Sequence, residues 1–60
     1  MFSVLEILDL AIKLERNGES VYRNAVGKVT KSDLVSLLLW MADEEAQHGR
    51  WFSEMKKKIE

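Results

Sequence analysis

The sequence contains no cysteine and no proline, and it has no apolar run long enough to cross a bilayer. Without cysteine the chain has neither disulfide bonds nor thiolate ligands, so a unit of 60 residues must gain stability from oligomerisation or from a metal held by other side chains. Nine basic and ten acidic residues give a net charge of −1, without a basic stripe suited to nucleic acid. We therefore expect no nucleic-acid or membrane partner, and the lack of an N-terminal targeting segment indicates a cytoplasmic protein.

The first predicted helix begins at a capping box. Ser3 and Glu6 have the spacing at which a serine oxygen accepts from a free backbone N–H and a glutamate accepts from the N–H of the cap residue. Helix-forming residues follow without a proline, and Gly27 is a natural C-terminal stop. The sequence therefore predicts a helix over about residues 3–26.

A second helix is predicted over about residues 32–59, after a turn at about residues 27–31. Either Thr30 or Ser32 can cap it. Two long helices joined by a short turn form an antiparallel hairpin, so residues 1–60 are predicted to be one all-α unit. The apolar surface of each helix is wider than one partner helix can cover, which favours dimerisation into a four-helix bundle or a multiple of such dimers.

Ionisable residues interrupt the apolar face of each predicted helix near its middle. Glu15 lies on the first helix, and Glu45 and His48 lie on the second, three residues apart and so on one helix face. Glu15 and Glu45 are equally far in sequence from Thr30 in the turn, so we expect them to face each other at one height. A two-fold axis at that height would gather four carboxylates and two imidazoles in one layer of the dimer.

Four carboxylates buried in one layer require positive charge. Alone they would take up protons, whereas two divalent ions would neutralise them. Carboxylate oxygen and imidazole nitrogen suit iron, manganese or zinc, and this donor set does not choose among the three. A Glu on each of two helices and a Glu-x-x-His on each of the other two form the di-iron or di-manganese site of four-helix bundles. We therefore predict two metal ions per dimer, held by Glu15, Glu45 and His48 of both copies.

These positions resemble a known family. Glu15, then Tyr22 seven residues later, then Glu45-x-x-His48 look like the first half of a rubrerythrin or ferritin-like domain, and the similarity covers nearly the whole chain. The resemblance implies a ferritin-like bundle with two iron ions per dimer, in which Glu15 and His48 are terminal ligands and Glu45 bridges the metals. It also implies that Tyr22 is a hydrogen-bond partner of the ligands.

The same resemblance implies a redox function. Ferroxidase or rubrerythrin-like oxidoreductase activity with dioxygen or peroxide is expected, with an electron donor that the sequence does not identify. The chain differs from rubrerythrins in having neither the second helix pair nor the cysteines of a rubredoxin iron. It is more similar to encapsulated ferritins, half-bundle subunits that complete a di-iron site between them, although their shell-targeting segment is not seen here.

A second interpretation is that the layer of Glu and His residues only fixes helix register in a structural or assembly module. Single residues also have two interpretations: Glu19, one turn after Glu15, is either an extra ligand or a residue at the exposed edge of the helix. Asp43 and Glu44 are expected on the solvated surface. Because the second helix has no clear stop signal, a natural chain that continues past Glu60 is a further interpretation.

Overall fold

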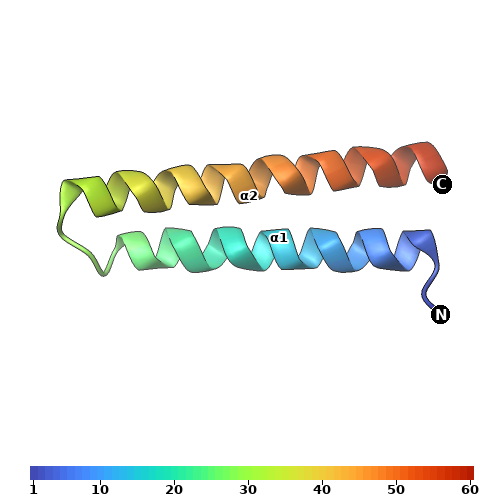
Figure 1. Ribbon diagram of the computed structural model, residues 1–60, viewed down its shortest axis with the longest axis horizontal. Helices are drawn as coiled ribbons and strands as arrows, with labels where there is room; N and C mark the ends of the chain where they lie inside the picture. The colour runs from blue at the N-terminus through green and yellow to red at the C-terminus, as the bar shows by residue number, and fades with distance from the viewer.

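Two α-helices packed side by side make up the protein, and the computed structural model describes all 60 residues (Figure 1). Helix α1 extends over Val4–Val26 and helix α2 over Ser32–Ile59. The helices are antiparallel, so both termini lie at one end of the hairpin and the turn at the other (Figure 1). The hairpin measures 43 by 19 by 12 Å, which is a single layer of two helices. This architecture confirms the predicted all-α hairpin.

Hydrogen bonds of the capping residues define the start of α1. The Ser3 side chain accepts from the Glu6 backbone N–H at 3.1 Å, and Glu6 Oε1 accepts from the Ser3 N–H at 3.0 Å. The predicted capping box is therefore present, and these hydrogen bonds lower the pKa of Glu6. At the other end of α1, Gly27 is the C-cap residue.

Helix α2 begins without a side-chain cap. The N-cap residue is Lys31, and it makes no capping hydrogen bond. The prediction that Thr30 or Ser32 caps this helix is wrong, because Ser32 is already the first helical residue and the cap position falls on the lysine between them.

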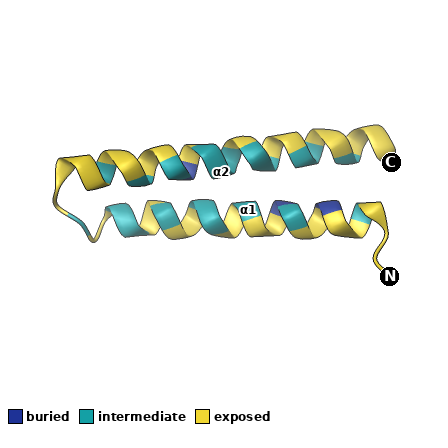
Figure 2. Cartoon of the chain, in the orientation of Figure 1, coloured by how far each residue is buried: buried dark blue, intermediate teal, exposed yellow.

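Few residues are buried between the two helices (Figure 2). Only Leu8 and Ile12 of α1 and Ala42 of α2 are buried among the 60 residues. Two exposed ion pairs also join the helices: Arg23 Nη2 lies 3.0 Å from Asp43 Oδ1, and a lysine of α2 pairs with an aspartate of α1 near the open end. Exposed ion pairs add little stability, so the single hairpin depends on a core of only these three buried residues.

Large apolar side chains line one flank of each helix and are exposed in the single hairpin. Because the helices are right-handed and antiparallel, the helical period places both flanks on the same side of the layer, which we call the apolar face. Neither helix combines the length and the hydropathy needed to cross a membrane. The large residues of the apolar face are Ile7, Leu10, Leu14 and Val21 of α1, and Leu34, Leu37, Trp40, Trp51, Met55 and Ile59 of α2.

Candidate metal centre

Three side chains with metal-ligand chemistry converge near the middle of the hairpin. Glu15 comes from α1, Glu45 and His48 come from α2, and one ligand atom of each lies within 4.8 Å of the others. His48 Nδ1 lies 3.5 Å from Glu15 Oε2, and all three residues are half-buried. The structure thus brings together the three residues that the sequence predicts as ligands. We call them the Glu/His group.

The two glutamates of this group start from different heights along the helices. The Glu45 side chain lies against Gly18, and a Cβ built at Gly49 would lie 3.7 Å from the Glu15 Cβ. The single height predicted from the equal distances to Thr30 is therefore wrong, by roughly one helical turn of about 5 Å. The helices are offset so that each glutamate faces a glycine, and the length of the glutamate side chains still lets the carboxylates meet.

The Glu/His group contains an oxygen atom without a hydrogen-bond donor. Glu15 Oε2 is buried and accepts no hydrogen bond, whereas buried polar atoms normally have a partner. The neighbouring Glu15 carboxyl and burial both raise the pKa of Glu45, more than the nearby His48 lowers it. Two ionised carboxylates have no proton to share, so a proton or a metal ion between them would satisfy the group.

Gly18 leaves the space that the Glu45 carboxyl group occupies. A Cβ at this position would lie 3.1 Å from Glu45 Oε2 and 3.2 Å from Glu45 Cδ, closer than ordinary van der Waals contact. The helical backbone here does not require glycine, and glycine inside a helix costs ~1 kcal/mol relative to alanine. The absence of a side chain at Gly18 therefore allows the Glu45 carboxyl group to lie where it does.

We expect Gly18→Ala to weaken metal binding by about tenfold, because the added methyl group displaces Glu45. Without metal, the flexible glutamate can move aside, so the variant should be as stable as the wild type or more stable by up to ~1 kcal/mol. Gly49→Ala is the matched control, since its new Cβ makes only an ordinary contact with Glu15. Calorimetric titration with Mn²⁺ and thermal melts in chelator measure both quantities. Equal affinities in the two variants would contradict this role of Gly18.

His48 faces a carboxylate on each side of its ring. Nδ1 faces Glu15, and Nε2 lies 4.0 Å from Glu44 Oε2. A metal bound through Nδ1 requires the proton on Nε2, and a carboxylate on that side favours this tautomer. Glu44, expected on the solvated surface, is thus a neighbour of the group that the sequence prediction missed. The spacing of four residues between Glu44 and His48 places them on one helix face and could have predicted this contact.

Glu19 and Tyr22 lie outside the Glu/His group. Glu19 Oε2 accepts a 2.8 Å hydrogen bond from Arg23 Nε, and the bonds of Arg23 to Glu19 and then to Asp43 raise the pKa of the arginine. Tyr22 is half-buried two turns after Glu15 and makes no side-chain hydrogen bond in the single hairpin. The ligand role of Glu19 and the hydrogen-bonding role of Tyr22 therefore stay predictions.

An antiparallel helical hairpin with two carboxylates and an imidazole at its middle has the make-up of a carboxylate-type metal protein. A family model described as Rubrerythrin matches residues 6–60, a range that contains the whole Glu/His group. The chain belongs to the rubrerythrin family, which confirms the resemblance and implies iron binding. No curated protein and no solved structure matches the chain.

The residues present fit an iron site. Two carboxylates and one imidazole are donors that iron accepts, and the Glu15 oxygen without a hydrogen-bond donor lies where a cation would satisfy it. One hairpin offers only three ligand groups in the Glu/His group, however, which is few for a pair of metal ions. The three residues are half of the ligand set of a two-metal site in a four-helix bundle, which has a Glu on each of two helices and a Glu-x-x-His on each of the other two.

Proposed function

We propose that the protein is a non-haem di-iron protein with ferroxidase or rubrerythrin-like oxidoreductase activity towards dioxygen or peroxide, its site shared between two hairpins. The observation that supports it best is the Glu/His group with its unsatisfied Glu15 oxygen, in a chain of the rubrerythrin family. Each chain contributes two carboxylates to the group, so a dimer has the four negative charges that balance two ferrous ions.

Each side chain has a separate task in the proposed site. Glu45 would bridge the two metals, while Glu15 and His48 would each bind one of them. Glu44 would hold the proton of His48 on the ring nitrogen that faces away from the metal. A bound ferrous pair supplies the electrons that reduce dioxygen or peroxide, so the protein supplies geometry and charge balance.

The apolar face is the surface through which two hairpins would associate. Its residues on α1 alternate in size at a spacing of three or four, the pattern of helices that pack together in bundles. His48 also packs against this face, with its ring centroid 5.8 Å from that of Trp51. Association here would therefore bring the second copy over the Glu/His group. The alternating residues are Ile7, Ala11, Leu14, Gly18, Val21 and Ala25.

We expect a dimer, or a multiple of dimers, of the 7.0 kDa chain in light scattering at micromolar concentration. Leu37→Glu should break the dimer and remove paired metal binding with it, because a charge on the apolar face is costly to bury. Leu39→Glu is the matched control: Leu39 is similarly exposed, at 41% against 49% for Leu37, but points to the opposite side of α2. A folded monomer that binds a metal pair would contradict the shared site.

Iron content and reactivity test the proposed activity. Protein purified without added metal and then given ferrous iron in air should retain about one iron per chain and show a charge-transfer band from its ligands to ferric iron. It should also consume oxygen faster than a His48→Ala variant under the same conditions. Protein that stays free of metal, or that oxidises iron no faster than this variant, would favour the structural alternative.

A further inference from the structure

Each helix presents a regular row of residues on the side of the apolar face. The α1 row is the alternation of large and small residues from Ile7 to Ala25, and none of its members is buried in the single hairpin. The row on α2 has the same spacing of four and three positions, which is typical of helices that pack along their length. This α2 row consists of Leu37, Met41, Glu44, His48, Trp51 and Met55.

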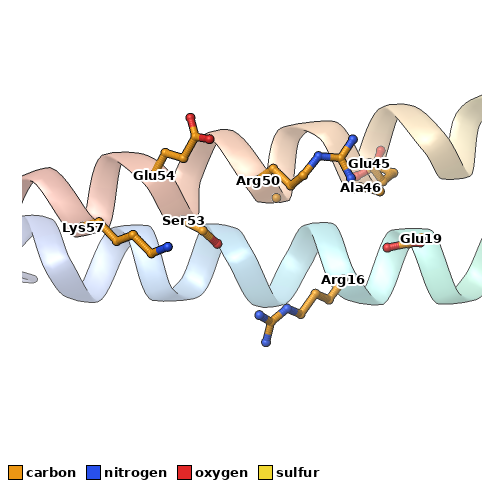
Figure 3. A pocket seen from close by; sticks show the side chains of 9 residues that line it. Arg16, Glu19, Glu45, Ala46, Arg50, Ser53, Glu54 and Lys57 are labelled. Carbon is orange, nitrogen blue, oxygen red and sulfur yellow. The ribbon is translucent and has the colours of Figure 1, made fainter.

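The opposite side of the layer is polar. A hollow of about 410 Å³ lies there between the helices, and only one of its nine lining residues is hydrophobic. Figure 3 shows this side, with the Arg16 guanidinium pointing away from α2 and the Arg50 side chain running along α2. A second helical hairpin with the same composition would therefore cover the two rows rather than the polar side.

The α1 row can pack on its own copy. A two-fold axis perpendicular to the helices places each row against the same row of the partner, running in the opposite direction. With the axis at position 16, Leu14 lies opposite the partner's Gly18, and Ala11 lies opposite the partner's Val21. Each large residue then faces a small one, so two copies of α1 can approach closely without clashes or gaps.

The α2 row can also pack on its own copy, with the axis at position 46. Glu44 then lies opposite the partner's His48, and Met41 lies opposite the partner's Trp51. The spacing also permits an axis shifted by half a heptad, but Glu44 would then face the partner's Met41 or Met55. A carboxylate opposite an imidazole is complementary, whereas one buried against methionine has no hydrogen-bond donor. Charge therefore favours the axis at position 46.

The hairpin places these two positions at nearly the same height. A dimer of two hairpins has one such axis, so the heights must agree. Across the hairpin, Glu15 lies beside Gly49, and Gly18 lies beside the Glu45 carboxyl group. Position 16 therefore lies opposite roughly position 48 of α2, within about 3 Å of position 46 along the helix. The two rows share no residue, and yet they agree on one axis.

We propose that a second copy binds the apolar face about a two-fold axis at positions 16 and 46, with α1 on the partner's α1 and α2 on the partner's α2. This inference rests on the proposed shared site and specifies the arrangement of its partner. The axis passes within one residue of Glu15 and Glu45, as a shared pair of metals requires. Glu44, which faces His48 of its own chain at 4.0 Å, then also faces the partner's His48.

Introduced cysteines can test this register, because the sequence has none. The variant with Ala11→Cys and Val21→Cys, oxidised in chelator, should form a disulfide-linked dimer. Neither single variant should do so, because position 11 lies about 15 Å along the axis from its own copy and a disulfide needs Cα atoms within about 7 Å. The matched control, Leu14→Cys with Ala25→Cys, should cross-link only if the axis is shifted by half a heptad. Cross-linking of this control and not of the first variant would overturn the proposal.

Wild-type protein provides a second measurement that does not depend on the folding of the variants. In dimers mixed from ¹³C-labelled and unlabelled chains, isotope-filtered NMR spectra in chelator should show contacts between the His48 ring and Glu44 of the other chain. Contacts of this ring with Leu37 or Trp51 of the other chain would instead indicate a shifted axis and overturn this inference alone. A monomer in light scattering would overturn both this inference and the shared site, whereas a dimer with the expected contacts supports the register even if it binds no iron.

Discussion

Glu45→Ala is expected to abolish binding of the metal pair, with a loss of affinity of at least about 100-fold. In the proposed dimer each Glu45 bridges both metals, so one substitution removes two bridging carboxylates and half of the negative charge of the layer. Glu44→Ala should weaken binding by only about tenfold, because Glu44 faces His48 at 4.0 Å and does not belong to the group.

Trp51 provides a direct measurement of this difference. Its ring lies 5.8 Å from that of His48, so a paramagnetic ion at the imidazole should quench its fluorescence. A Trp40→Phe background leaves Trp51 as the only tryptophan. Titration with Mn²⁺ or Fe²⁺ under nitrogen then compares the variants, with Glu54→Ala as a control for the loss of a carboxylate elsewhere on α2. Equal affinities of the Glu45→Ala and Glu54→Ala variants would disprove the ligand assignment.

The helices could be predicted from the sequence because their signals are local. The capping box at Ser3 needs only residues within one turn, and the structure shows both of its hydrogen bonds. The start of α2 has no comparable signal. With hydroxyl residues on both sides of Lys31, the sequence permits two caps, and the structure uses neither.

The composition of the Glu/His group could be predicted, but its register could not. Counting residues from Thr30 treats the turn as symmetric, whereas the offset of the helices depends on which side chains fit between them. Gly18 and Gly49 decide it, because each leaves room for a glutamate of the opposite helix. A glycine can be assigned to such a contact only once the partner helix is known. The sequence alone therefore predicts the contact only weakly.

Glu15→Gln should stabilise the metal-free protein and remove most of the stabilisation that metal provides. The buried Glu15 oxygen has no hydrogen-bond donor, and a glutamine amide could donate to the Glu45 carboxylate across the group. The same change removes a ligand and a negative charge at the proposed metal site. The structural alternative predicts the opposite signs, because there the carboxylate would already be satisfied and the substitution would destabilise.

The pH dependence of stability tests whether repulsion between the two carboxylates causes the difference between wild type and Glu15→Gln. The pKa of Glu45 is raised in the folded state, mainly by the Glu15 carboxyl, so the ionised form of Glu45 is disfavoured by folding. This cost is fully present above the raised pKa and is gone below the ordinary glutamate value. The melting temperature of metal-free wild type, compared with that of Glu15→Gln, should therefore rise as the pH falls through this interval. Glu54→Gln should leave the pH profile of the wild type unchanged.

Metal binding should stabilise the wild type, whereas the repulsion between its carboxylates destabilises it. A ligand that binds only the folded protein stabilises it by ~2.7 kcal/mol at a hundredfold excess over its dissociation constant, which corresponds to a rise of about 10 °C or more for a domain this small. Thermal melts of wild type, Glu15→Gln and Glu54→Gln, each with chelator and with ferrous or manganous ion, measure all of these effects together. A destabilised Glu15→Gln variant, together with a wild type whose melting temperature does not respond to metal, would rule out the di-metal site and leave the Glu/His group as a device for helix register.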